Sequence, residues 1–164
     1  MSSEKEVKDL MVSIFDYPHV PYWFSVGQAV QLIRMSVSGQ PDRLDPVAIL
    51  VFDEKYNLVG TATRNDLLKG LGPDSWKARA TEDERSSLSE AEFLSGARER
   101  AERPISEVME GVKHVVQPDD SVTHAAFMMV RNSLAMLPVL EGKKKFVGLI
   151  RMAEVFDDLA AGAE

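Results

Sequence analysis

The chain has 164 residues, of which 45% are hydrophobic and 27% are charged, a composition that suits one ordinary globular domain or two small ones. Its formal net charge of −7 argues against binding to nucleic acid or to anionic membranes, because both are held chiefly by clustered Lys and Arg side chains. The sequence has no cysteine, which excludes disulfides, thiol catalysis and zinc–thiolate sites.

The first nine residues are polar and of mixed charge, and they lack the apolar segment of a signal peptide. No apolar run in the sequence approaches the roughly 20 residues that a membrane helix needs. The absence of cysteine also fits a reducing compartment. We therefore expect a soluble, cytoplasmic protein that binds neither membranes nor nucleic acid.

The first half begins with an opener at residues 7–11, Val-Lys-Asp-Leu-Met, followed by a short extended segment at Val20-Pro21. Ser25 then precedes four apolar residues at helical spacing, Val26, Ala29, Val30 and Ile33. Serine is a favoured N-cap because its hydroxyl accepts a hydrogen bond from a free backbone N–H. This pattern predicts an amphipathic helix that starts after Ser25.

A hairpin and a second helix complete the first half. Residues 48–52 are apolar throughout, which predicts a buried strand, and the polar turn at 53–57 leads into a second strand at 58–62. A short polar turn and the acid Asp66 then start a helix. Residues 36–45 separate the first helix from the buried strand, and their glycine, proline and charges predict a solvent-exposed loop.

Residues 72–103 form a strongly charged insert with few large apolar side chains. Within it, Ser89-Glu90-Ala91-Glu92 has the pattern of a capping box, and Phe93, Leu94 and Ala97 form a narrow apolar stripe. We predict one helix over residues 90–103, stopped by Pro104 and preceded by a loop. We interpret the insert as a solvated linker rather than a functional arm.

The second half repeats the first, element by element. An opener at 105–109 and an extended segment at 115–118 precede a helix capped by Ser121, with apolar residues Val122, Ala125, Ala126 and Met129. Strands at 137–140 and 146–150 flank a polar turn, and a last helix begins near Glu154. The chain therefore divides into a first repeat (1–71), the insert (72–103) and a second repeat (104–164).

Short motifs within this duplication carry a resemblance to a known family. They are the openers Asp9-Leu10-Met11 and Glu107-Val108-Met109, the strand Leu137-Pro138-Val139, and the spacing of Gly60, Thr63 and Asp66. With these motifs in order, the sequence resembles a tandem pair of cystathionine-β-synthase-type (CBS) regulatory domains, also called a Bateman module. The resemblance covers nearly the whole chain apart from residues 72–103.

The resemblance implies a mixed α/β (α+β) fold in which two β-α-β-β-α repeats pack about a pseudo-twofold axis, and it implies a homodimer. It also implies that an adenosine-containing nucleotide (AMP, ADP, ATP or S-adenosylmethionine) binds between repeats as a regulatory, energy-sensing ligand, with no catalytic cofactor. Because no enzyme, channel or transporter is attached, we expect a stand-alone module that signals to a separate effector protein.

The first candidate site lies at the turn before the second helix. Thr63 and Asp66 are three residues apart, so their side chains point to the same side of the first helical turn. The Thr63 hydroxyl can donate to a phosphate, and the Asp66 carboxylate can accept hydrogen bonds from a ribose diol, with Arg64 adding charge. The alternative is that Thr63 caps the helix and Asp66 complements its dipole; the two roles are compatible.

By family analogy, an apolar slot for adenine is lined by the segment before each first helix and by the start of the Pro-Val strand. The residues at these positions are Val20, Pro21, Val116, Pro118, Met136, Leu137 and Pro138. All seven are also residue types found in ordinary cores.

The second repeat departs from the pattern, because Arg151 stands at the threonine position and Glu154 at the aspartate position. Arginine can clamp a phosphate. Alternatively, Glu154 pairs with Arg151 and fills the cleft. We therefore expect one good nucleotide site and one altered site.

The aromatic run Tyr22-Trp23-Phe24 has no counterpart in the second repeat. Exposed aromatic side chains mark an interface with a second copy or with a partner. The alternatives are stacking on adenine and packing against the long loop of the first repeat.

The three histidines show no metal-ligand spacing, and we expect no catalytic residues, no metal and no enzymatic activity. We interpret the acids at 119, 120, 157 and 158 as a solvated face rather than a magnesium site. The rival to nucleotide binding is a nucleotide-free scaffold for protein interaction and dimerisation.

Overall fold

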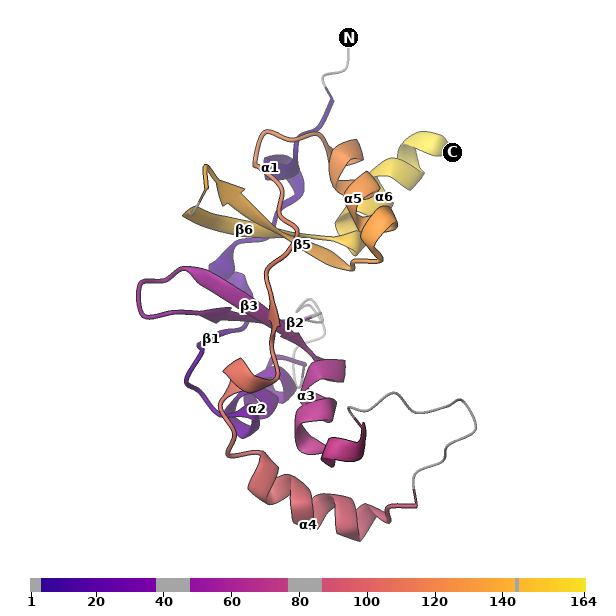
Figure 1. The fold of residues 1–164 in the computed structure, drawn as a ribbon. Helices are drawn as coiled ribbons and strands as arrows, with labels where there is room; N and C mark the ends of the chain where they lie inside the picture. Colours follow the sequence, from indigo (N-terminus) through magenta and orange to yellow (C-terminus); the bar gives the residue numbers. More distant parts are fainter. Residues whose placement is uncertain (1–3, 38–47, 77–86, 144) are drawn as a thin grey trace. The chain divides into compact units, whose positions relative to one another are not determined.

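The computed structural model describes residues 4–37, 48–76, 87–143 and 145–164 (Figure 1). Its α-helices are α1 (Val7–Leu10), α2 (Val26–Val37), α3 (Arg64–Leu71), α4 (Glu90–Arg100), α5 (Val122–Asn132) and α6 (Met152–Ala163). Its strands are β1 (His19–Pro21), β2 (Ala48–Phe52), β3 (Leu58–Thr63), β4 (Glu110–Gly111), β5 (Met136–Glu141) and β6 (Lys145–Arg151). Short 3-10 helices are η1 (Ile14–Asp16), η2 (Asp74–Trp76) and η3 (Ile105–Glu107). Residues 38–45 of the predicted loop fall outside the described residues.

The chain forms two compact units. The first unit is Pro18–Gly111, and the second unit combines Met1–Tyr17 with Val112–Glu164. This division differs from the division into sequence repeats, because the opener of each repeat belongs to the unit built from the other repeat. The repeat boundaries at 71 and 104 therefore describe the sequence pattern and do not coincide with the edges of the compact units.

The first unit contains a sheet with the strand order β1-β2-β3-β4. β1 runs parallel to β2, whereas β2 with β3 and β3 with β4 are antiparallel pairs. All five residues of β2 are buried, as its continuous apolar run predicts. α2 and α3 lie on one face of the sheet (Figure 1), and α2 contributes the buried side chains Val26, Ala29 and Ile33.

The second unit repeats this arrangement around the hairpin of β5 and β6. Val116 forms a parallel bridge to Val139, and Val12 forms an antiparallel bridge to Leu149, so the flanking segments take the places of β1 and β4. α5 and α6 pack side by side (Figure 1). The core contains Val122, Ala125 and Met129 of α5. The predicted mixed α/β fold with an internal duplication is confirmed.

Each opener, together with the residues just before it, contacts the start of the first helix of the other repeat. In the second unit, the Val7 amide donates to the Asp120 carbonyl at 2.8 Å, and the Val122 amide donates to the Lys5 carbonyl at 3.2 Å. In the first unit, the amide of Val26 donates to the carbonyl of Arg103 at 2.8 Å. These bonds satisfy amides that a helix N-terminus otherwise leaves unpaired.

The insert contributes α4, which begins after the N-cap Ser89 as predicted and ends at Arg100, three residues before the predicted end. Its contacts correct the interpretation of the insert as a solvated linker. The Ala97 side chain is buried, the Phe93 and Trp76 rings stack with centroids 5.3 Å apart, and the Gly27 amide of α2 donates to the Ala101 carbonyl at 2.8 Å. α4 is therefore part of the first unit, where it packs against α3 and its C-terminal end bonds to the start of α2.

Candidate functional site

The turn between β3 and α3 is held by a reciprocal pair of hydrogen bonds between Thr63 and Asp66. The Thr63 hydroxyl accepts from the Asp66 amide at 3.1 Å, and the Asp66 carboxylate accepts from the Thr63 amide at 2.9 Å. The Thr63 hydroxyl also lies 3.0 Å from the same carboxylate oxygen, to which it donates its proton. Thr63 is thus the N-cap of α3 in a complete capping box.

This geometry fixes the Asp66 carboxylate in a defined orientation. Asp66 is 6% exposed, and all the hydrogen bonds described for its side chain use Oδ2. A carboxylate has acceptor capacity on both oxygens, so Oδ1 retains capacity for a ligand. The Thr63 hydroxyl donates to Asp66, so the predicted phosphate contact requires that bond to be exchanged. Arg64, the next residue, is exposed.

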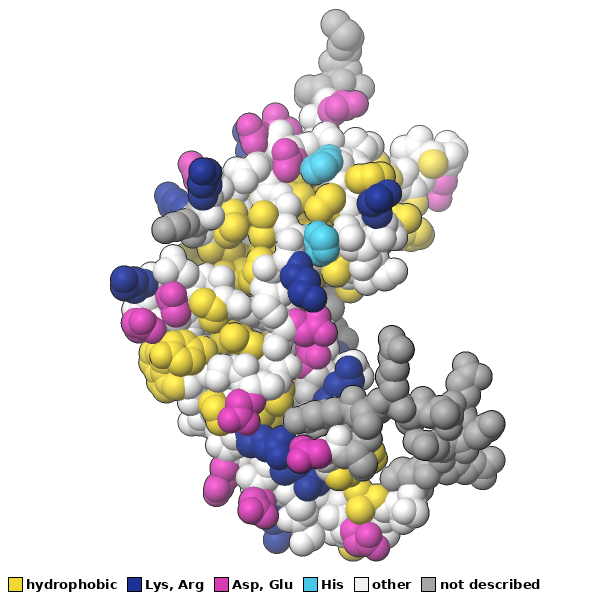
Figure 2. Space-filling view, in the orientation of Figure 1, with side chains coloured by type: hydrophobic (Ala, Val, Ile, Leu, Met, Phe, Trp, Pro, Cys, Tyr) yellow, Lys and Arg dark blue, Asp and Glu magenta, His cyan; other side chains and the backbone are white. Residues whose placement is uncertain are grey.

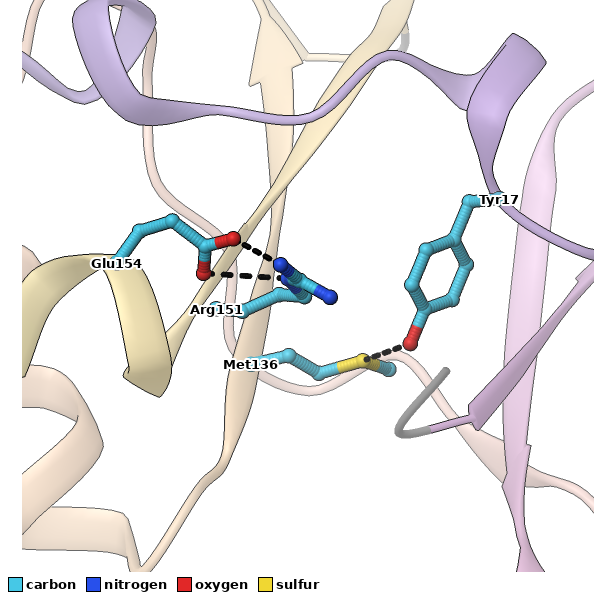
Figure 3. Close-up of polar contacts among 4 residues, drawn as sticks. All are labelled: Tyr17, Met136, Arg151 and Glu154. Carbon is cyan, nitrogen blue, oxygen red and sulfur yellow. Dashed lines mark hydrogen bonds and ion pairs between the residues drawn. The ribbon is translucent and has the colours of Figure 1, made fainter. Parts of the chain in front are cut away.

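The equivalent turn of the second unit, between β6 and α6, contains an ion pair in place of the capping box. Arg151 Nε donates to Glu154 Oε2 at 3.1 Å, and Arg151 Nη2 contacts Oε1 of the same carboxylate. Arg151 is the N-cap residue of α6 but makes no side-chain cap bond. The predicted alternative in which Arg151 pairs with Glu154 is the arrangement observed (Figure 3).

Tyr17 and Met136 lie beside this ion pair (Figure 3). Met136 is paired with Arg151 in the β5–β6 ladder, and the Tyr17 hydroxyl lies 3.9 Å from the Met136 sulfur. The guanidinium of Arg151 lies between the Glu154 carboxylate and the Tyr17 side chain (Figure 3). Sequence reasoning missed Tyr17, because no motif marks a residue that reaches this turn from the far end of the sequence.

Comparison with known families identifies the second half of the chain. Residues 105–161 match the CBS domain family. These residues form a CBS domain. A comparison with curated protein sequences finds no match.

Solved structures with the same fold cover both halves. CBSX2 from Arabidopsis thaliana, a CBS-pair protein, superposes with a TM-score of 0.71 at 17% identity over 98% of each chain; the structure of CBSX2 with AMP gives 0.68 at 18% identity, over 97% of this chain and 98% of that one. The CBS-domain pair of protein MJ0100 with 5′-methylthioadenosine and S-adenosylmethionine gives 0.64 at 17% identity, over 99% of this chain and 100% of that one. The cytosolic domain of the Mg²⁺ channel MgtE with ATP gives 0.65 at 21% identity, over 95% of this chain and 49% of that one. The chain as a whole therefore has the fold of a CBS pair.

In the first half of the pair, the structure does not bring Val20 and Pro21 to the Thr63 turn. Thr63 pairs with Ala48 at the start of β2, whereas Val20 pairs with Val51, three residues further along. Three residues of strand span about 10 Å. Val20 is buried in the core of the first unit, and its contact with adenine stays a prediction.

Among the adenine contacts predicted in the second half, the structure places Met136 next to Arg151. Val116 bonds through its backbone amide to the Pro138 carbonyl at 3.0 Å, and its side chain is buried. Leu137 is a fully buried core residue, Pro138 is also buried, and Pro118 is half-buried. The side chains of Val116 and Leu137 therefore serve the core, and Met136 is the predicted adenine contact at the turn itself.

The aromatic run divides between surface and core. Tyr22 and Trp23 are 38% and 53% exposed and pack edge to face with ring centroids 5.2 Å apart, whereas Phe24 packs against the core of the first unit. Figure 2 shows hydrophobic side chains gathered on the surface beside β1. The interface interpretation thus applies to Tyr22 and Trp23, and packing explains Phe24.

In the described part of the chain, no group of three or more His, Asp or Glu side chains is arranged to hold a metal ion. Within the same residues, no helix is both long enough and apolar enough to cross a membrane.

Proposed function

We propose that this CBS pair is a regulatory module that binds an adenosine-containing nucleotide at the Thr63–Asp66 turn and passes its occupancy to an effector protein. The observation that carries the proposal is the Asp66 carboxylate, which is 6% exposed and is oriented by the Thr63 capping box with acceptor capacity left on Oδ1. We further propose that the module acts in the cytoplasm, and the proposal includes no catalytic step.

The ligands of the similar structures indicate which part of the nucleotide Asp66 contacts. AMP and ATP carry phosphate, whereas 5′-methylthioadenosine and S-adenosylmethionine carry none. Adenine and the ribose ring with its 2′,3′-diol are the parts that all four share. A carboxylate accepts two hydrogen bonds from vicinal hydroxyls, so we propose that Asp66 binds the ribose.

Isothermal titration calorimetry of the full chain with AMP, ATP and S-adenosylmethionine tests this proposal. We expect at least one of them to bind, and Asp66→Ala to weaken that binding by about 1.5–3 kcal/mol, the scale for hydrogen bonds to a charged group. The matched control is Glu54→Ala, which removes an exposed carboxylate of the same unit. No heat from any of the three ligands at millimolar concentration would reject nucleotide binding.

The alternative function is a nucleotide-free scaffold, and one observation favours it. The Arg151 guanidinium contacts both carboxylate oxygens of Glu154. At the second turn, these side chains therefore bond to each other rather than being oriented toward a ligand. The calorimetric experiment separates the two functions, because a scaffold binds none of the ligands.

We also propose that the chain forms a homodimer through α5 and α6. Both helices expose large apolar side chains to solvent: Phe127 (56%), Val130 (76%) and Phe156 (64%). Figure 2 shows hydrophobic side chains on the surface over these helices. Two of the three corresponding positions of the first unit are polar, Gln31 and Arg34, whereas the third is Leu68.

Light scattering after size-exclusion chromatography tests the dimer. Val130→Ser combined with Phe127→Ser is expected to give a monomer, because the substitutions remove exposed apolar surface that association buries. Leu68→Ser, at an exposed apolar position of the first unit, is the control and is expected to leave the mass unchanged. A dimer that persists in the double variant would place the interface elsewhere.

A further inference from the structure

The two strand-to-helix turns of the duplication are equivalent in position but opposite in chemistry. Thr63 and Arg151 each end a strand that pairs with the start of the preceding strand, opposite Ala48 and Met136 respectively. Each residue is the N-cap of the helix that follows. The residues of the first turn bond to one another in a capping box, whereas those of the second turn form an ion pair between side chains. The two turns can therefore be compared directly, because they differ in their residue pair but not in their position in the repeat.

The carboxylates at the two turns differ in how the described hydrogen bonds are distributed over their two oxygens. At the first turn, the described bonds of Asp66 use one oxygen, Oδ2. At the second turn, both oxygens of Glu154 contact the Arg151 guanidinium. A bidentate pair of this kind fixes both groups in one plane. A ribose diol can therefore bond to Oδ1 of Asp66 without competing with a described bond, whereas at Glu154 it must share both oxygens with the Arg151 guanidinium.

The burial of the pair opposes that exchange. The Arg151 side chain is 4% exposed and the Glu154 side chain is 24% exposed. A buried guanidinium that loses its carboxylate is left as an uncompensated charge, which is strongly unfavourable. AMP replaces both partners only if its phosphate takes Arg151 and its ribose diol takes Glu154 at the same time, so the bidentate pair must separate completely before either contact forms.

We propose that the Arg151–Glu154 ion pair closes the second turn to nucleotides, so that each chain binds a single nucleotide, at the Thr63–Asp66 turn. This inference rests on the function proposed above. Glu154 takes the place beside Arg151 that a phosphate would otherwise fill. The CBS pair therefore has one nucleotide site despite its duplicated sequence. The residues that determine this asymmetry are Arg151 and Glu154.

Calorimetric titration of the full chain with AMP measures the number of sites. The wild type is expected to bind one AMP per chain. In the double variant Arg151→Thr with Glu154→Asp, which rebuilds the residues of the first turn, two are expected. The converse double variant, Thr63→Arg with Asp66→Glu, transfers the ion pair to the first turn and is expected to bind none.

The outcomes separate this inference from the proposed function. Two AMP molecules per wild-type chain, or one AMP that Asp66→Ala leaves in place, would overturn the inference and leave nucleotide binding standing. A wild type that binds none of AMP, ATP and S-adenosylmethionine overturns the proposed function. In that case, binding gained by Arg151→Thr with Glu154→Asp would still support the ion pair as a closure, and no gain would reject both.

A measurement on the wild type does not depend on whether the variants fold. The side-chain Nε–H resonance of Arg151 in a ¹⁵N spectrum, assigned with Arg151→Lys, reports the bond to Glu154 directly. At AMP concentrations that saturate the protein, we expect this resonance to keep its chemical shift. A shift that follows the binding isotherm would show that AMP opens the pair, and would overturn the inference.

Discussion

Gly60 packs against Met109 so closely that a Cβ atom on Gly60 would stand 2.6 Å from the Met109 sulfur. The same relationship recurs in the second unit, where a Cβ atom on Gly148 would stand 3.1 Å from the sulfur of Met11. Each glycine of the duplication therefore receives the methionine of an opener that belongs to the other repeat. Because these two positions have no side chain, the methionine of each opener can pack directly against the strand that contains the glycine.

Gly60→Ala is expected to lower the free energy of unfolding by about 1–3 kcal/mol, the usual cost of overpacking. The Met109 side chain can move, but the added Cβ would also stand 2.8 Å from the backbone carbonyl of Glu110, so β4 must shift. Urea denaturation followed by circular dichroism measures the change.

The matched control is Gly111→Ala. Gly111 pairs with Gly60 in the β3–β4 ladder, yet nothing lies within 4 Å of a Cβ atom built there. We expect a change within about 0.5 kcal/mol. Equal losses in the two variants would mean that the loss of glycine, rather than the contact with β4, is responsible.

The strands and helices could be predicted because their signals are local. The apolar run of β2 and the serines before α2 and α5 each identify an element from a few adjacent residues. The exchange of openers could not be predicted in this way. Val7 bonds to Asp120, more than a hundred residues away, and nothing in the five residues of the opener specifies which repeat it joins.

The same distinction applies to the candidate site. Thr63 and Asp66 are three residues apart in one helical turn, so their spacing alone places them together. The distance of Val20 from Thr63 depends instead on the register of β1 against β2, which is set by packing of the whole sheet. Tyr17 reaches Met136 because Met1–Tyr17 belongs to the second unit, a property of tertiary structure that no local pattern records.

Thr63→Val is expected to lower the free energy of unfolding by about 1 kcal/mol, because it removes the side-chain cap of α3. It also removes the hydroxyl that helps to orient Asp66, so AMP affinity should fall as well. Thr63→Ser keeps the hydroxyl and is expected to retain both properties. Thermal unfolding and calorimetry on the three proteins measure the effects; a Thr63→Val variant with the wild-type unfolding free energy would contradict the capping role.

Asp53 makes the stability of the β2–β3 hairpin depend on pH. Its Oδ1 accepts from the amides of Asn57 at 2.8 Å and Lys55 at 2.9 Å, and the hydrogen bond from the Asn57 backbone is the main cause that lowers the pKa of Asp53 below its ordinary value of 3.8. A carboxylate with a lowered pKa in the folded state stabilises that state fully above its ordinary pKa. The contribution is lost as the pH falls through the lower, folded-state value.

We therefore expect Asp53→Asn to be less stable than the wild type at neutral pH, with the difference disappearing as the pH falls from about 5 to about 2. Chemical denaturation at a series of pH values gives this difference directly. Glu54→Gln, at an exposed position of the same turn, serves as the control and should show no such trend. A difference between Asp53→Asn and wild type that stays constant with pH would contradict the assignment.

Arg100 connects α4 of the insert to the C-terminal end of α3. Its Nε donates to the carbonyl of Leu71, the last residue of α3, at 2.6 Å. Carbonyls at a helix C-terminus lack partners within the helix, and a cationic donor there satisfies one of them and complements the helix dipole. Arg100→Ala is therefore expected to lower the free energy of unfolding by about 1 kcal/mol and to accelerate amide hydrogen exchange in the last turn of α3.

The control for this prediction is Arg98→Ala, which removes an exposed arginine from the same helix and leaves the Leu71 bond in place. It should preserve both the stability and the exchange rates of α3. If Arg98→Ala and Arg100→Ala have equal effects, the charge of α4 rather than the Leu71 contact stabilises the unit. If neither changes exchange in α3, α4 is anchored by the Trp76–Phe93 stack and the carbonyls that cap α2, and Trp76→Ala should then release it.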